Sequence, residues 1–427
     1  MNWLNTLVNQ HSELESPISF WYWAGLSSIS AVVKDQVWLH RQIYNLYPNI
    51  YVMLHADSGL KKGPPVSMAK QLVTKVNNTQ IISGRSSIQG ILKQMGGGET
   101  LPGGKIKTKS QVFICSSELS SSIVDDPVAT KILTDLYDRQ YNIGEWKSLL
   151  KMETFNLKDP TVTMLTATNE AMSDEFFTNS SIQGGYIART FIIYESKRNK
   201  PNSLIWPLTN APNYNTSADY LKEIAKLQGP FEPLAVLEEN DVYKYKKMKE
   251  GREIFFNEPG IVYDDWYDNF LEQVDAQEVK DETGTLNRFG DSVLKIAMLL
   301  SLADKPELIL SAECMHNAIQ ACEKLVGNIR KTTVGKKGMS QTAALKSLII
   351  NELLTRDTHS VSKAVLMKKM WMHYGTENEF DEMMNSFEGS GIIKTESRGN
   401  QVIYAMPEAH VKELKEFFAG KLQRKNK

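Results

Sequence analysis

Apolar residues in the first half of the chain fall into short continuous runs, separated by polar segments that contain glycine. Strands are expected at Asn49–His55, Thr79–Ser83, Gln111–Ser116, Thr161–Thr168 and Ala188–Tyr194. Helices are expected between them, at Pro64–Val76, Ser86–Met95 and Asp126–Tyr137. Fully apolar strands that alternate with helices are typical of a mostly parallel sheet covered on both faces. The pattern therefore predicts an α/β core.

The segments around this core are expected to be mainly helical. Pro17–His40 mixes aromatic and small residues and suits a buried pair of helices. Gly96–Gly104 is expected to be a loop, because ordering so many glycines costs backbone entropy. Tyr141–Leu157 suits a β-hairpin. From about Tyr214 on, amphipathic helices are expected at Tyr220–Leu227, Trp266–Val279, Phe289–Leu302 and Ala312–Ile329.

The C-terminal part follows a polar linker at Thr332–Gln341. Helices are expected at Thr342–Thr355, Ser360–His373 and Glu377–Gly389, and strands at Gly391–Glu396 and Gln401–Tyr404 around a turn at Ser397–Asn400. Three helices followed by a hairpin predict a winged-helix domain. The expected domains are an N-terminal helical segment (1–47), an α/β core (48–213), a helical lid (214–331), a winged helix (342–410) and a basic helix or tail (411–427).

Composition and charge narrow the class of protein. With 427 residues, 41% hydrophobic and 23% charged, the chain suits a globular protein of several domains. A net charge of −1 argues against a uniformly basic surface, so nucleic acid would meet local patches. Neither a membrane span nor a secretory signal is expected. The cysteines have no ligand spacing, and buried thiols in a reducing cytoplasm are expected at Cys115, Cys314 and Cys322.

The strongest candidate for chemistry is the glycine and lysine segment after the first strand. A phosphate-binding loop needs a tight turn whose N–H groups approach the phosphates, and a lysine that reaches the β and γ oxygens. Lys62 stands at the lysine position, whereas Gly63 replaces the usual hydroxyl residue that helps to hold Mg²⁺. A lysine-bearing surface turn is the alternative. The predicted nucleotide-binding residues are Ser58, Gly59, Lys61, Lys62, Gly63 and Pro64.

Polar residues that follow the later strands complete the predicted ATPase site. In P-loop ATPases the third strand ends in an acidic pair that organises Mg²⁺ and polarises the attacking water. Here Ser117 and Glu118 stand at these positions, which predicts Glu118 as catalytic and both as metal site residues. Asn169 could orient the water, or it caps the next helix. Arg189 could reach the γ-phosphate of a neighbouring subunit, or it is a partnered surface arginine. ATP and Mg²⁺ are the expected cofactors.

With these residues in place, a resemblance to a known family can be stated. The stretch LYPNIYVMLHADSGLKKGPPVSMAK resembles the P-loop region of phage and mobile-element replication ATPases, whose loop commonly reads G-P-S-G-x-R-K-G-T. Ser117-Glu118-Leu119-Ser120 is similar to the S-E-L-S that ends the third strand of that family. Gly184, Gly185 and Arg189 are similar to its later GG-x-x-x-R segment. The resemblance spans about Pro17–Leu302 and implies ATP binding in DNA replication, in a bacterial host cytoplasm.

A broader similarity is to AAA+ helicases of the minichromosome maintenance type, which combine an ATPase core, a helical lid and a C-terminal winged helix. Their hairpin before the fourth strand carries a lysine that touches DNA, which implies DNA-binding roles for Lys147 and Lys151. A solvated hairpin edge is the alternative. Arg288 resembles a second nucleotide-sensing arginine.

The winged helix leaves two kinds of partner open. Its third helix, Glu377–Gly389, is acidic and would repel phosphates. Basic residues stand instead on the second helix and in the wing, where Lys394 and Arg398 are DNA-binding candidates. The module therefore binds DNA through the wing and second helix, or it binds protein.

The function that these features imply is an ATP-driven replicative DNA helicase, a ring of subunits that translocates on single-stranded DNA. The expected partners are single-stranded or forked DNA, further copies of the chain, and a separate primase, polymerase or initiator protein. No membrane is expected. The alternative is a replication initiator or helicase loader that binds nucleotide without translocating and acts through the winged helix. A DNA-packaging ATPase would need a nuclease domain with clustered carboxylates, which the sequence after the core lacks.

Overall fold

The computed structural model of the protein describes most of the chain. The described residues are 2–84, 86–96, 100–101, 105–106, 110–117, 126–138, 144–150, 153–168, 185–200, 212–275, 284–334, 349–350, 352–354, 356, 358–370, 376–389, 391–398, 401–408 and 410–411. They divide into two compact units. The first comprises Met1–Glu272 and Asp281–Leu325, and the second Gln273–Lys280 and Val326–Lys427.

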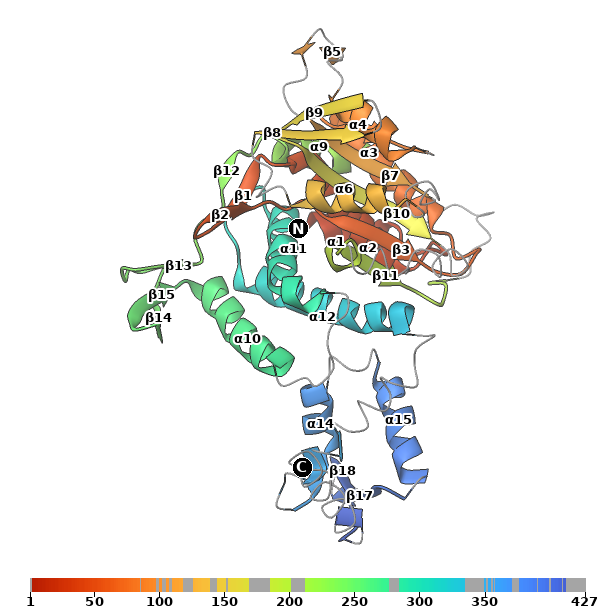
Figure 1. The fold of residues 1–427 in the computed structure, drawn as a ribbon, viewed down its shortest axis with the longest axis vertical. Coiled ribbons are helices and arrows are strands. Elements are labelled where there is room, and N and C mark those ends of the chain that lie inside the picture. The colour runs from red at the N-terminus through yellow and green to blue at the C-terminus, as the bar shows by residue number, and fades with distance from the viewer. Residues whose placement is uncertain are drawn as a thin grey trace. The chain divides into compact units, whose positions relative to one another are not determined.

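A five-stranded sheet forms the centre of the first unit (Figure 1). Its order is β11 (Thr190–Tyr194), β3 (Tyr51–His55), β10 (Thr161–Thr168), β7 (Gln111–Ser116) and β4 (Gln80–Ile82). All four pairings are parallel. Every residue of β3 and β10 is buried, as expected for central strands of a parallel sheet that is covered on both faces. The predicted α/β core with a parallel sheet is confirmed.

Helices cover both faces of this sheet. The helices of the core are α1 (Trp3–Gln10), α2 (Ile18–Val33), α3 (Gly63–Val76), α4 (Ile88–Gly96), α6 (Pro127–Tyr137) and α9 (Tyr214–Ile224). On α2, the Ser30 hydroxyl lies 2.9 Å from that of Thr163 on β10. On the other side, the Tyr51 hydroxyl donates to the Leu133 carbonyl of α6 at 2.9 Å. Tyr51 pairs with Met164, and successive side chains of a strand point to opposite faces, so α2 and α6 lie on opposite sides.

The predicted hairpin before β10 is confirmed. It consists of β8 (Glu145–Leu150) and β9 (Glu153–Lys158), paired antiparallel. The predicted loop at Gly96–Gly104 contains part of a second, shorter pair that the sequence did not suggest, β5 (Thr100–Leu101) with β6 (Lys105–Ile106). Two-residue strands leave too short a pattern to be recognised.

The prediction of an entirely helical N-terminal segment was wrong in its last part. The second helix ends at Val33, and Lys34 takes a positive φ of 56°. The chain then forms β1 (Val37–Arg41) and β2 (Tyr44–Leu46), which pair antiparallel, while β1 also pairs in parallel with β12 (Gly229–Pro230). Val37 and Leu39 of β1 are buried and the residues between and after them are less so. This two-residue period is that of a strand, which explains why the segment is not helical.

The predicted lid is also only partly helical. The helices within its range are α9, α10 (Glu258–Asp275), α11 (Phe289–Asp304) and most of α12 (Ala312–Val334), and a short 3₁₀ turn at Leu286–Arg288 precedes α11. Another 3₁₀ turn, Ile187–Arg189, precedes β11. Between α9 and α10 lies a three-stranded antiparallel sheet that the sequence did not suggest, with the order β13 (Ala235–Val236), β15 (Arg252–Phe256), β14 (Tyr245–Lys249). Glu250 and Gly251 both have positive φ, which suits the tight turn between β14 and β15.

The second unit contains helices and a small antiparallel sheet. Its elements are β16 (Ser360–Ser362), α14 (Lys363–Met370), α15 (Glu377–Gly389), β17 (Lys394–Arg398) and β18 (Gln401–Ala405), with helical residues also at 349–350 and 352–354. The sheet order is β16-β18-β17. The helix expected from Ser360 therefore starts three residues later. Phe380, Phe387 and Tyr404 belong to its buried core. Among the described helices of the whole chain, none is long and apolar enough to cross a membrane.

Candidate phosphate-binding loop and its surroundings

The predicted phosphate loop lies between β3 and α3, as the sequence suggested. Leu60 is buried, whereas Ser58 and Gly59 are exposed. Positive φ values of 91° at Gly59 and 52° at Lys61 turn the chain sharply. The Ser16 hydroxyl donates to the Lys61 carbonyl at 2.7 Å and ties the loop to the segment before α2.

The start of α3 supplies favourable charge for an anion. The helix begins at Gly63 and carries proline in its first turn, where a missing N–H costs nothing. Pro64 and Pro65 have no N–H, so among the first three positions of the helix only Gly63 has an N–H without a partner within the helix. The helix dipole favours negative charge at this end.

Lys62 is held inside the loop. Its ammonium donates to the carbonyls of Ala56 and Asp57, at 2.6 and 2.9 Å. Burial lowers the pKa of Lys62, and the nearby Asp57 carboxylate partly opposes that shift. The ammonium is therefore oriented by loop carbonyls next to the first turn of α3.

The order of the strands gives this loop its position. From β3 the chain crosses past β10 and β7 to reach β4, and from β10 it crosses past β3 in the opposite direction to reach β11. Adjacent strands whose connections leave in opposite directions make a crevice at their carboxyl ends, where ligands bind in open α/β sheets. Here these strands are β3 and β10, and the loop follows β3 at that edge.

The other predicted members of the site are only partly described. Ser117 follows β7 and is exposed. Glu118 and Asn169, expected after β7 and β10, lie outside the described residues. A side-chain atom built on Gly63 would meet nothing within 4 Å, so the space that a hydroxyl residue would occupy is open. Within the described ranges, no group of three or more His, Cys, Asp or Glu side chains could hold a metal ion.

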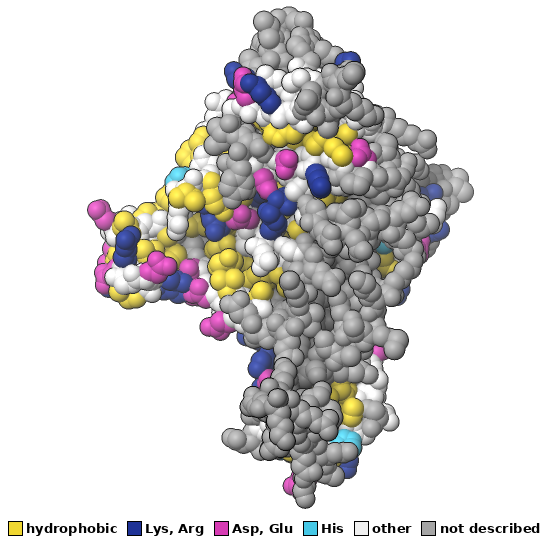
Figure 2. Space-filling view, in the orientation of Figure 1, with side chains coloured by type: hydrophobic (Ala, Val, Ile, Leu, Met, Phe, Trp, Pro, Cys, Tyr) yellow, Lys and Arg dark blue, Asp and Glu magenta, His cyan; other side chains and the backbone are white. Residues whose placement is uncertain are grey.

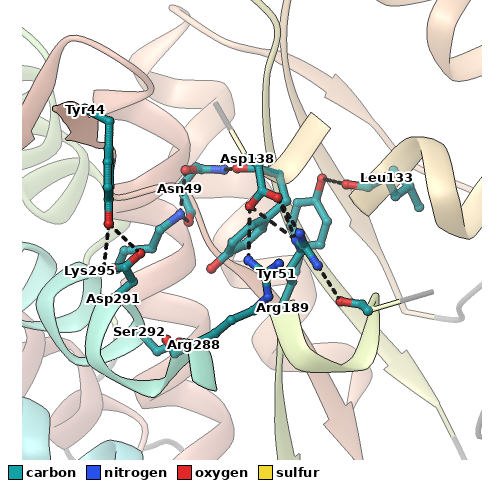
Figure 3. A network of polar contacts seen from close by, with 12 residues as sticks. Tyr44, Asn49, Tyr51, Leu133, Asp138, Arg189, Arg288, Asp291, Ser292 and Lys295 are labelled. Atoms are coloured by element: carbon teal, nitrogen blue, oxygen red, sulfur yellow. Dashed lines mark hydrogen bonds and ion pairs between the residues drawn. The ribbon is translucent and has the colours of Figure 1, made fainter. Parts of the chain in front are cut away.

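Arg189 does not have the environment that its predicted role requires. It precedes β11 at the amino edge of the sheet, and its side chain is 7% exposed. Its guanidinium donates to both carboxylate oxygens of Asp138, with two contacts of 3.2 Å, and to the Gly185 carbonyl at 2.9 Å (Figure 3). A finger must be exposed to reach another subunit. The geometry instead supports the alternative of a partnered arginine, although a buried one.

Arg288 lies in the same cluster and not at the phosphate loop. Its guanidinium is 3.7 Å from the Asp138 carboxylate, and α11, which it precedes, also carries Lys295 (Figure 3). The Lys295 ammonium donates to the carbonyl and side-chain oxygens of Asn49, which precedes β3, at 3.0 and 2.9 Å. The length of β3, roughly 15 Å, separates this edge from the loop. Arg288 therefore does not sense nucleotide on the loop of its own chain in this conformation.

The predicted DNA-binding lysines are exposed where they are described. Lys147 on β8 is 62% exposed and forms an ion pair with Glu145 at 2.8 Å. Lys394 on β17 is exposed. Arg398 ends β17, but its side chain is outside the described part, as is all of Lys151. On the second predicted helix, Lys363 pairs with Glu377 and Asp381.

One polar residue at the loop was missed by the sequence analysis. His55 is the last residue of β3 and is 3% exposed, and neither of its ring nitrogens has a hydrogen-bond partner among the described residues. The signal in the sequence is a single histidine that ends an apolar strand immediately before the loop.

A comparison with protein-family models finds no match for this chain, and a comparison with curated proteins finds no similar sequence.

Proposed function

We propose that this chain binds ATP at the loop Ala56–Gly63 and hydrolyses it. The observation that carries the proposal is the position of this loop at the carboxyl end of β3, beside β10, with Lys62 next to the first turn of α3. In open α/β sheets ligands bind at such a point of the strand order. In this proposal Lys62 holds the β- and γ-phosphates. Glu118 activates water, Asn169 orients it, and Ser117 and Glu118 take part in binding Mg²⁺. Neither Arg189 nor Arg288 is assigned a part.

We further propose that hydrolysis drives a replicative DNA helicase of AAA+ type that works as a ring of subunits on single-stranded DNA. The hairpin β8–β9 supports this reading, because it directly precedes β10 and presents Lys147 to solvent. The contact with DNA must be local, since basic and acidic side chains are intermixed over the described part of the face in Figure 2. Electrostatic contact of this kind would be largely independent of base sequence.

The second unit fits a winged helix in which β17 and β18 form the wing. Its helix α15 carries acidic residues and no lysine or arginine. Ion pairs occupy Lys363 and also Lys369, which contacts Glu352 at 2.6 Å. These charges favour a protein partner for this unit over duplex DNA, which supports the alternative function of an initiator or helicase loader.

Steady-state ATP hydrolysis with and without single-stranded DNA tests the proposal. We expect turnover that DNA stimulates, and its loss in Lys62→Ala and in Glu118→Gln. The matched control is Lys70→Ala, which removes an exposed lysine of the same helix whose ammonium donates to the Ser83 hydroxyl at 2.9 Å. The control should retain full turnover.

The outcomes separate the two functions. Nucleotide binding without turnover, or turnover that survives Glu118→Gln, would exclude the motor and favour the initiator or loader. Unwinding of a forked DNA and a ring in negative-stain images with an ATP analogue would support the motor. Absence of nucleotide binding in the unaltered chain would overturn both.

A further inference from the structure

The imidazole of His55 is buried without the hydrogen bonds that a buried polar group normally makes. A neutral imidazole has one N–H donor and one acceptor nitrogen. In the part of the chain that the structure describes, neither nitrogen has a partner, although the side chain is 3% exposed. Buried polar groups are nearly always hydrogen-bonded, because leaving them unpaired is costly. Two unpaired nitrogens on one side chain therefore need a specific reason.

The surroundings of His55 place it at the phosphate loop. The charges of Lys62 and Asp57 both act on the imidazole, and burial, as the largest cause, lowers its pKa to about 4. The ring is therefore neutral near pH 7. In register, Tyr194 of β11 and Thr168 of β10 flank it, and the Tyr194 ring lies 5.2 Å away between centroids. His55 thus lies at the carboxyl edge of the sheet and directly precedes the loop.

His11 shows that burial alone does not leave a histidine of this chain unpaired. It is fully buried, and its Nδ1 lies 2.7 Å from the Leu7 carbonyl oxygen. Its Nε2 lies 3.0 Å from the Tyr214 hydroxyl. Both histidines are buried, but within the described residues they differ in hydrogen bonding. The one whose nitrogens lack partners is the one beside the loop.

We propose that His55 is a ligand-binding residue of the nucleotide site, and that its ring N–H donates a hydrogen bond to the phosphate chain of the bound nucleotide. This inference rests on the proposed function. Phosphate oxygens are strong acceptors, and a neutral N–H can serve them as the backbone N–H groups of the loop do. A neutral donor also avoids placing a second positive charge beside Lys62.

The inference predicts that one variant gains thermal stability and loses affinity for nucleotide. His55→Leu keeps a similar volume and removes both unpaired nitrogens. The nucleotide-free variant should therefore melt about 2–4 °C higher than the unaltered chain. Its affinity for nucleotide should fall roughly tenfold, because a hydrogen bond to a charged ligand is lost. A purely structural histidine would not produce this combination.

Thermal unfolding without nucleotide and titration with a fluorescent ADP analogue and with ATP provide the two readouts. The matched control is His11→Leu, which loses two satisfied hydrogen bonds and should melt lower with unchanged nucleotide affinity. If the unaltered chain binds no nucleotide, the proposed function fails. If it binds nucleotide and His55→Leu binds equally well, the inference about His55 fails and the proposed function stands.

A measurement on the unaltered chain covers the case in which His55→Leu does not fold. Histidine labelled with ¹³C gives separate ring resonances in NMR spectra, which single substitutions assign. Addition of ADP or ATP should shift the His55 resonance and leave the His11 resonance in place. A His55 resonance that does not move at saturating nucleotide would overturn the inference.

Discussion

The variant Asp138→Asn tests whether Arg189 stabilises its own subunit through the ion pair with Asp138 or acts in a neighbouring subunit. Asp138 follows α6, and both oxygens of its carboxylate accept hydrogen bonds from the Arg189 guanidinium. The Arg288 guanidinium lies 3.7 Å from the same carboxylate. Asp138→Asn keeps the shape and removes the charge. Arg189, at 7% exposure, would then be a buried cation that keeps the Gly185 carbonyl and a neutral amide as acceptors.

The expected magnitude follows from the burial of the two partners. Removing one member of a buried ion pair costs about 3–5 kcal/mol, because the other charge is left uncompensated. The retained amide oxygen places Asp138→Asn near the lower end, at about 3 kcal/mol. Arg189→Met should cost less, about 1–2 kcal/mol, since Asp138 is 15% exposed and keeps Arg288 nearby. The double variant should lose less unfolding free energy than the sum of the losses in Asp138→Asn and Arg189→Met.

Urea unfolding followed by tryptophan fluorescence measures these free energies. Of the eight tryptophans, Trp371 alone belongs to the second unit, so the signal reports the first unit. A loss below about 1 kcal/mol in Asp138→Asn would refute the reasoning. So would an Arg189→Met variant of unchanged stability whose ATP turnover falls more than about tenfold, because that result would restore the role in a neighbouring subunit.

Three further predictions concern single residues. Burial lowers the pKa of Lys295 from its ordinary 10.5 to about 7, so between these values the unfolded chain binds a proton that the folded chain lacks, and stability should rise with pH. Urea unfolding at pH 7, 8 and 9.5 should show the unaltered chain gaining stability relative to Lys295→Met, and parallel profiles would contradict this. Gly63→Ser should fold normally, because the added atoms meet open space. In a fluorescence titration the variant should bind nucleotide more tightly when Mg²⁺ is present, and an unchanged dependence on Mg²⁺ would argue against the assigned site. Gly185→Ala should lower the free energy of unfolding in urea by about 1–3 kcal/mol, since φ is +71° and the new carbon would lie 2.8 Å from the Arg189 guanidinium. The control Gly144→Ala, with φ of +85° and open space, should lose less stability. Equal losses would show that the contact with Arg189 adds no cost.

Much of the core could be predicted because its signals are continuous along the chain. The five strands of the parallel sheet are rich in apolar and β-branched residues, and the sharp turn at Gly59 comes soon after one of them. The small sheet of β13, β14 and β15 was missed for the opposite reason. Its strands have two to five residues, and β14 alternates exposed Lys246 and Met248 with half-buried neighbours, so no apolar run marks it.

The amino-acid sequence by itself determined the strand, loop and helix that carry Lys62, because these residues are neighbours in the chain and their conformations depend on local glycine, proline and apolar spacing. Tertiary structure alone decided what surrounds Arg189. Its partner Asp138 lies 51 residues earlier, and the two side chains form a buried ion pair only because the fold brings the residue after α6 next to the segment before β11. The same holds for the burial of His55, which lies in register between Thr168 of β10 and Tyr194 of β11. Local geometry follows from residue type, whereas charge pairing and burial depend on which distant segments the fold brings into contact.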